Sequence, residues 1–129
     1  MVKLSELGTE ETITWCPGCG NFSIHTAMKN AIVEMNHEPH NVLLVAGIGC
    51  HGHIPNWINT YGFCTLHGRA LPVALGAKLA NHELTVIVNS GDGDCYGEGM
   101  NHFINTARTN VDITLLVHNN KLYSLTTGQ

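Results

Sequence analysis

Two apolar runs rich in β-branched residues predict parallel strands in the C-terminal half of the chain. The runs cover Leu84–Val88 and Val111–Val117. Both are short and continuous, as in strands that are buried on both faces of a sheet. Apolar residues recur at helical spacing between them: Met100, Phe103, Ile104 and Ala107. The stretch therefore predicts a strand, a crossover helix and a second strand that runs parallel to the first.

The same periodicities predict further elements before this stretch. Asn21–Asn36 carries its apolar residues on one stripe and predicts an amphipathic helix that packs on the sheet. Asn41–Ala46 (NVLLVA) predicts a buried strand, Leu71–Asn81 predicts a helix, and Met1–Thr12 predicts an extended arm or loop. The whole pattern predicts an α/β fold in which residues 1–129 form one domain, a parallel twisted sheet with helices on both faces.

Single residues within these elements carry expectations of their own. Gly76 costs about 1 kcal/mol relative to alanine inside a helix, which predicts a close contact with the sheet or a neighbour. Cys64 and Cys95 have no motif partner and are expected to be small buried residues. We expect His25 to lie at the boundary of its helix's buried face.

Composition narrows the classes of function. The net charge of −4 offers no basic patch, so electrostatic binding of nucleic acid has no support. The chain has no apolar run long enough for a membrane span and begins without an apolar signal core, so we expect no membrane association and a cytoplasmic location. Charged residues make up only 12% of the chain, which suggests that a partner subunit covers part of its surface. Five cysteines, an odd number, favour metal or cluster ligation over disulfides.

Acidic and amide residues follow the two C-terminal strands. Gly91–Asp94 follows the first strand, and Asn119–Asn120 follows the second. Because parallel strands end at one edge of a sheet, Asp92 and Asn120 are expected to be neighbours. Their oxygens suit Mg²⁺, and the glycines and the following helix N-terminus favour an anion, so the pattern predicts a diphosphate held through a metal. The alternative is an ordinary loop in which Asp92 or Asp94 only caps the helix.

A second group of candidate functional residues lies in the segment Trp15-Cys16-Pro17-Gly18-Cys19-Gly20. A CxxC motif in a Pro/Gly turn directs two thiolates toward one centre. A thioredoxin-like redox pair requires a preceding strand, which the pattern does not predict. Two other interpretations stay open: a zinc site completed by Cys50 and a histidine, and an iron–sulfur cluster with Cys50 as third ligand.

His51 and His53 follow Cys50 in a loop marked by glycine and proline. The loop contains no third metal ligand. We therefore interpret both histidines as lining an active site, with surface histidines as the alternative.

Several motifs together resemble one known family. GDG followed by NN resembles the thiamine diphosphate motif. Together with WCPGCG, GIGC, LHGRALPVALGAKLAN and NNKLYSLTTGQ, it resembles the β subunit of the 2-oxoacid:ferredoxin oxidoreductases from Trp15 to Gln129. The resemblance implies a thiamine diphosphate-binding fold and oxidative decarboxylation of a 2-oxoacid to an acyl-CoA. It also implies electron transfer through a 4Fe-4S cluster to ferredoxin.

The resemblance assigns roles to particular residues. The implied Mg²⁺ ligands are Asp92, the side chain of Asn120 and the backbone carbonyl of Leu122. The implied cluster ligands are Cys16 and Cys19, in an N-terminal cluster segment 13–20, and Cys50. The remaining implied cofactor contacts are Ile48, Gly49, Cys50, His67, Gly91, Gly93, Asp94, Tyr123, Leu125 and Thr126.

Two histidines are the catalytic candidates. His67 reaches the cofactor phosphates by resemblance. His53 stands where relatives carry a basic side chain that pairs with the substrate carboxylate, and a histidine there makes that charge depend on pH. This departure leaves the choice of 2-oxoacid open.

The resemblance also implies partners. In such enzymes a glutamate from another cofactor-binding domain activates thiamine, and neither Glu83 nor Glu98 stands in a context that suggests this role. The family's fourth cluster cysteine lies in a C-terminal extension beyond the position of Gln129. We expect the chain to be a fragment; the alternatives are an incomplete cluster and a fourth ligand from another chain. We expect it to work with an α subunit, ferredoxin, a 2-oxoacid and coenzyme A. Two alternatives are a cluster-free thiamine-dependent decarboxylase subunit and a non-catalytic module that binds Mg²⁺-diphosphate.

Overall fold

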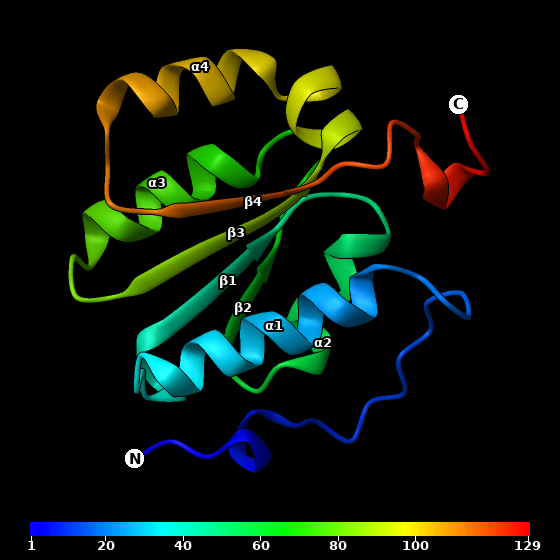
Figure 1. Ribbon diagram of the computed structural model, residues 1–129. Coiled ribbons are helices and arrows are strands. Elements are labelled where there is room, and N and C mark those ends of the chain that lie inside the picture. Colours follow the sequence, from blue (N-terminus) through cyan, green and yellow to red (C-terminus); the bar gives the residue numbers. More distant parts are fainter.

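A four-stranded parallel sheet forms the centre of the computed structural model, which describes residues 1–129 (Figure 1). The strand order is β2-β1-β3-β4, and every neighbouring pair is parallel. The strands are β1 (Val42–Ala46), β2 (Tyr61–Cys64), β3 (Thr85–Gly91) and β4 (Thr114–His118). Ala46 pairs with Asn89, and Gly91 pairs with His118, so the carboxyl ends of β1, β3 and β4 meet at one edge of the sheet.

Helices cover both faces of this sheet (Figure 1). The four α-helices are α1 (Asn21–Glu34), α2 (Ile54–Trp57), α3 (Ala70–Ala80) and α4 (Met100–Thr109). Helices α1 and α2 lie on one face, and α3 and α4 lie on the other. Short turns complete the chain: 3-10 helices at Leu4–Leu7, Pro39–Asn41, Cys50–His53 and Ser124–Thr126, and a π-helix at Gly93–Glu98. The predicted α/β architecture is confirmed.

Alternation along the inner strands divides the interior into two cores. Leu44 faces the core under α1 and α2, whereas Val45 faces the core under α3. Helix α1 buries one side chain per turn toward the sheet: His25, Met28 and Ile32. This spacing matches the 3.6-residue period of an α-helix, so only one stripe of α1 meets the sheet.

Several boundaries and local expectations differ from the sequence prediction. Strand β3 continues to Gly91, while β4 begins only at Thr114. The segment Met1–Thr12, predicted as an extended arm or loop, contains a 3-10 turn whose Leu7 is fully buried. Strand β2 was not predicted. It is a short edge strand whose residues are all exposed, so it lacks the buried apolar run on which strand prediction relies.

Three single-residue predictions also need correction. A Cβ at Gly76 would meet no atom within 4 Å, so no close contact explains this glycine. Cys64 is exposed on β2, although Cys95 is buried as expected. His25 lies inside the core rather than at its boundary, and its Nε2 donates to the carbonyl of Trp57 at 3.1 Å. None of the helices combines the length and the apolar character that crossing a lipid bilayer requires.

Candidate cofactor site

A cavity of about 670 Å³ opens at the carboxyl-end edge of the sheet. Its walls come from the CxxC segment, the loop after β1, the turn after β3 and the segment after β4. Every residue predicted for the site lines this cavity: Cys16, Cys19, Ile48, Gly49, Cys50, His53, His67, Gly91, Asp92, Gly93, Asp94, Asn120, Leu122, Tyr123, Leu125 and Thr126. The fold thus brings all of these residues to one cavity.

The two loop tips predicted to converge are in direct contact. The backbone N–H of Asn120 donates to Asp92 Oδ1 at 3.3 Å. The Asn120 side-chain oxygen accepts from the N–H of Leu122 at 3.0 Å, and its amide nitrogen donates to Ser124. A hydrogen bond therefore joins the loop after β3 to the loop after β4, and the carboxylate and amide oxygens at this junction are of the hard kind that Mg²⁺ prefers.

Tyr123 joins the C-terminal segment to the turn after β3. Its hydroxyl donates to the carbonyl of Gly93 at 3.2 Å. A Cβ at Gly93 would lie 2.5 Å from the Tyr123 ring, so a glycine is needed here for the ring to pack. Packing of the Tyr123 ring therefore explains why the GDG motif has a glycine at position 93.

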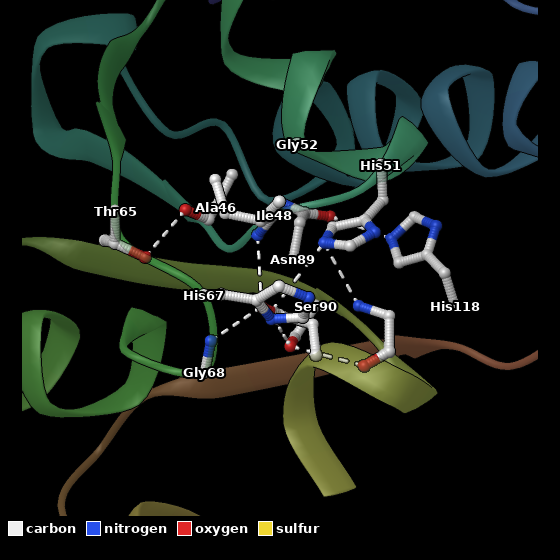
Figure 2. Close-up of polar contacts among 12 residues, drawn as sticks. Ala46, Ile48, His51, Gly52, Thr65, His67, Gly68, Asn89, Ser90 and His118 are labelled. Carbon is white, nitrogen blue, oxygen red and sulfur yellow. Dashed lines mark hydrogen bonds and ion pairs between the residues drawn. The ribbon is translucent and has the colours of Figure 1, made fainter. Parts of the chain in front are cut away.

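Asp94 lies at the junction of three loops, with its side chain 1% exposed. Figure 2 shows the residues that donate to its carboxylate, Ile48, Gly68 and Ser90. Its Oδ1 accepts from the backbone N–H groups of Ile48 at 3.1 Å and Gly68 at 2.8 Å. Its Oδ2 accepts from the hydroxyl of Ser90 at 2.5 Å. The carboxylate is therefore occupied by donors of the protein, and it fixes the loops after β1 and before α3 against the end of β3.

His67 faces the same carboxylate from the loop before α3. Its Nδ1 lies 2.8 Å from Asp94 Oδ1, an ion-pair distance without the alignment of a hydrogen bond. A carboxylate oxygen this close favours the tautomer that has its hydrogen on Nδ1 over the one that has a lone pair there. The ring also packs edge-on against Tyr123, with centroids 5.9 Å apart. These contacts leave Nε2 as the nitrogen that is free to meet a ligand.

His53, the other catalytic candidate, has a different environment. The residue is exposed, and its ring stacks on Trp57 with centroids 5.6 Å apart. It lines the cavity from the outer side of the loop. The stack restrains the ring and leaves it in contact with solvent.

Two further histidines line the site: His51, which was predicted to line it, is buried, whereas His118, which was not predicted, is partly buried. His51 is 5% exposed, and its Nε2 accepts from the N–H of Gly91 at 3.1 Å. His118, the last residue of β4, lies between the side-chain oxygens of Asn21 at 2.9 Å and Asn89 at 3.2 Å. Burial lowers the pKa of each histidine to about 4, and for His51 the neighbouring His118 adds to this shift while Asp94 opposes it. Both rings are therefore neutral at pH 7. The sequence marked His118 only by its place directly before the NN pair.

Three cysteines share another part of the cavity wall. Cys16 is exposed, and Cys19 and Cys50 are half-buried. Burial raises the pKa of the Cys50 thiol, and the thiols of Cys19 and Cys16 raise it further, because each disfavours a second negative charge nearby. No three His, Cys, Asp or Glu side chains converge in the arrangement that would hold a single metal ion.

Trp15 fastens the CxxC segment to the loop of the third cysteine. Its indole N–H donates to the backbone carbonyl of Cys50 at 2.6 Å. The ring packs edge-on against Trp57, with centroids 4.5 Å apart, and against Phe22. The position of Cys50 relative to Cys16 and Cys19 therefore depends on this side chain.

Substituting Trp15 with Phe is expected to loosen this attachment. The change keeps an aromatic ring but removes the donor to Cys50, so we expect a loss of about 1 kcal/mol in the free energy of unfolding. We also expect the Cys50 thiol to react several-fold faster with a thiol reagent, measured by the rate of modification and peptide mapping. Trp57→Phe is the matched control, because the Trp57 indole N–H has no hydrogen bond in the structure. Equal rates in the two variants would contradict the role of the Trp15 donor.

Comparison with known proteins gives this site a class. Residues 25–129 match the family model of the thiamine pyrophosphate enzyme C-terminal TPP-binding domain. The chain therefore belongs to the thiamine pyrophosphate enzymes, as a TPP-binding domain of that family. This agrees with the diphosphate-binding geometry of the sheet edge.

Within that family the chain is similar to subunits of one kind of enzyme. It is 51% identical over 121 residues to the β subunit of 2-oxoacid:ferredoxin oxidoreductase 1 from Aeropyrum pernix. It is 56% identical over 117 residues to the corresponding β subunit from Saccharolobus solfataricus. These matches cover 94% and 89% of this chain but only 38% of each relative. The chain therefore spans well under half the length of these relatives.

A solved structure is similar over the whole fold. It is the 2-oxoglutarate:ferredoxin oxidoreductase from Magnetococcus marinus, described with 2-oxoglutarate, coenzyme A and succinyl-CoA bound. The superposition has a TM-score of 0.96 at 38% sequence identity and covers 99% of this chain and 44% of that one. The resemblance noted from the sequence motifs is confirmed.

Proposed function

We propose that this chain is the thiamine diphosphate-binding part of the β subunit of a 2-oxoacid:ferredoxin oxidoreductase. With an α subunit, such a protein oxidatively decarboxylates a 2-oxoacid to an acyl-CoA and passes the electrons through a 4Fe-4S cluster to ferredoxin. The contact between Asp92 and Asn120, in a cavity that three cysteines also line, is the observation that supports this proposal. The names of the similar β subunits support the same activity.

The residues of the cavity fit Mg²⁺ and thiamine diphosphate. Asp92, the Asn120 side-chain oxygen and the carbonyl of Leu122 would hold the metal. His67 has Nδ1 engaged beside Asp94, so its Nε2 is free to contact a phosphate oxygen. Thiamine diphosphate, when bound, supplies the carbanion chemistry that decarboxylation of a 2-oxoacid requires. The protein's own part is to bind and orient the cofactor with these oxygens and donors.

The cysteines fit a cluster better than a single ion. Cluster cysteines each bind a different iron, so their sulfurs stand farther apart than the ligands of one ion. This agrees with three thiols around one cavity that do not converge on a point. The two other cysteines do not line the cavity, since Cys64 lies on β2 and Cys95 in the core under α3. We therefore propose that the fourth ligand comes from outside these 129 residues.

Binding of thiamine diphosphate tests the proposal directly. We expect the wild-type chain to bind the cofactor only with Mg²⁺, and Asp92→Ala to weaken binding on the order of 100-fold, since a charged ligand is worth about 3 kcal/mol. Isothermal titration calorimetry, with and without Mg²⁺, measures both effects. Glu10→Ala is the control, because Glu10 is exposed and lies outside the cavity. Binding that ignores Mg²⁺ or survives Asp92→Ala would contradict the assignment.

Activity requires the complete enzyme. The chain's full-length form, co-purified anaerobically with its α subunit, is expected to reduce ferredoxin when a 2-oxoacid and coenzyme A are present. A panel that includes pyruvate and 2-oxoglutarate would identify the substrate. Iron and sulfide analysis separates this function from that of a cluster-free decarboxylase subunit, which would contain neither.

A further inference from the structure

The ring of His118, the last residue of β4, lies between two asparagine side chains. Its Nε2 is 3.2 Å from the side-chain oxygen of Asn89, beside which Figure 2 shows it. Its Nδ1 is 2.9 Å from the side-chain oxygen of Asn21. A neutral imidazole donates from one nitrogen and accepts at the other, and an asparagine amide is able to do either. The ring therefore joins Asn89 to Asn21, residues that are far apart in the chain.

Asn89 fixes one side of this ring in the centre of the sheet. It is 0% exposed and lies in β3, which pairs with β1 on one side and with β4 on the other. Its side-chain nitrogen has no hydrogen-bond partner, so the contact with His118 is the only one that this buried amide makes. A polar side chain in the core is unfavourable without a partner, and the position of Asn89 is explained by the ring that it holds.

Asn21 connects the ring to the cysteine segment. It is the first residue of α1 and stands two residues after Cys19. Its side chain makes no other hydrogen bond, and no side chain caps the start of α1. Trp15 holds the preceding end of the same segment, through the carbonyl of Cys50. The CxxC segment is therefore fastened at its first end to the loop after β1 and at its second end to β4.

The NN turn begins directly after His118. Asn120 contacts Asp92 in that turn, and both Asn21 and His118 line the same cavity. A ligand that fixes Asn120 also restricts the backbone that leads into it, and so favours the position of the ring in which Nδ1 meets Asn21. When two sites share such a contact, a ligand that binds at one of them stabilises the other.

We propose that His118 is a positioning residue that couples the NN turn to the CxxC segment, so that binding of Mg²⁺ and thiamine diphosphate orders the start of α1. The inference rests on the proposed function for the identity of this ligand. The coupling needs the Nδ1 contact with Asn21, while the Nε2 contact with Asn89 holds the ring in place. The cysteines of the segment are then held in one arrangement whenever the cofactor is bound.

Hydrogen exchange measures this coupling at the start of α1. The backbone N–H groups of residues 22–24 donate to the carbonyls of Cys19 and Gly20, so a ligand in the cavity does not accept from them. Their exchange therefore reports opening of the turn and not direct shielding by the ligand. We expect saturating thiamine diphosphate with Mg²⁺ to slow their exchange about tenfold in the wild-type chain, the effect of one hydrogen bond.

Two substitutions separate the coupling from a structural role. In His118→Gln, the amide stands near the Nε2 position and remains a partner for Asn89, but no polar group remains at the Nδ1 position. In His118→Asn, the amide stands near the Nδ1 position and remains a partner for Asn21, but Asn89 loses its only hydrogen bond. We expect His118→Gln to unfold near the wild-type temperature and to show no slowing of exchange by the cofactor. We expect His118→Asn to unfold at a lower temperature and to keep the slowing.

Asn21→Ala removes the contact from its other side. We expect it to abolish the slowing as His118→Gln does, and we expect the double variant to show no further change. His82→Gln is the control, because His82 is exposed and lies outside the cofactor cavity. Calorimetric titration of each variant gives the cofactor concentration that saturates it.

Other results overturn the inference. If His118→Gln keeps the slowing, or if loss of the slowing follows the unfolding temperatures of the variants, His118 has only a structural role, while the proposed function stands. If the wild-type chain binds thiamine diphosphate without a change of exchange at residues 22–24, the turn and the segment are not coupled. If the wild-type chain binds no thiamine diphosphate, the proposed function fails and this inference fails with it.

Discussion

Gly47→Ala is expected to be among the most destabilising single substitutions in this chain. A Cβ at Gly47 would lie 1.7 Å from Oδ2 and 2.5 Å from Cγ of Asp94. The carboxylate cannot move away without breaking hydrogen bonds, because Ile48, Gly68 and Ser90 all donate to it. We expect a loss of more than about 4 kcal/mol in the free energy of unfolding, measured by urea denaturation.

The internal control is alanine at another glycine. A Cβ at Gly76 meets open space, so Gly76→Ala is expected to stabilise the chain by about 1 kcal/mol, the difference in helix propensity. Removing the obstructing carboxylate should relieve part of the clash. The double variant Gly47→Ala with Asp94→Ala is therefore expected to cost less than the sum of the two single changes. Additive costs would show that Gly47 is required for a reason other than Asp94.

The same network separates two substitutions at Asp94. Alanine would leave two buried backbone N–H groups and a hydroxyl without their acceptor, each at a cost of about 1–3 kcal/mol. Asparagine keeps an oxygen for Ile48 and Gly68, and the Ser90 hydroxyl is able to reverse and accept from the new amide. The order of destabilisation is therefore Asp94→Ala above Asp94→Asn.

The position of the site was predictable because it follows from strand direction. Parallel strands joined by a crossover helix end at one edge, so Asp92 and Asn120 had to meet wherever the exact strand boundaries fell. The observed contact between them confirms this reasoning although β4 begins at Thr114. The position of a motif at the end of a strand can therefore be predicted correctly even when the predicted strand boundaries are wrong by a few residues.

The direction of side chains within the turns was not predictable in the same way. Asp92 and Asp94 stand two residues apart in one glycine-rich turn, yet Asp92 contacts the NN loop and Asp94 turns inward. The difference comes from the π-helical turn at Gly93–Glu98 and from donors on distant loops, such as Gly68. Neither leaves a periodic signal in the sequence.

Elements held only by long-range contacts were also missed. Strand β2 forms because the edge of β1 offers it a partner, and Val45 pairs with Phe63 in that ladder. The N-terminal arm is fixed by isolated contacts, among them the N–H of Val2 donating to the side chain of Asn36 at 3.2 Å. Such contacts join residues far apart in the chain, so no local pattern predicts them.

Acid is expected to destabilise the chain through three histidines, of which His25 and His51 are buried and His118 is partly buried. Burial lowers the pKa of His25, His51 and His118 below their unfolded value of 6.5, to about 4 for the last two. Lys29 adds to the shift at His25, and at His51 the carboxylate of Asp94 opposes the effects of His118, His67 and His53. As the pH falls below 6.5, these histidines become protonated in the unfolded chain but stay neutral in the folded chain. Stability is therefore full above pH 7 and is lost progressively toward pH 4.

The size of the effect follows from the shifts. A histidine with a folded pKa of about 4 contributes a loss of roughly 2 kcal/mol at pH 5, so His51 and His118 together account for about 4 kcal/mol. Urea denaturation at pH 7.5 and pH 5.0 measures this difference. His51→Gln removes one titrating group and should reduce the pH dependence by about half, whereas the exposed His82→Gln should leave it unchanged. Equal stability at the two pH values would mean that these rings accept protons in the folded chain, and the neutral state of His51, whose Nε2 accepts from the N–H of Gly91, would be lost with it.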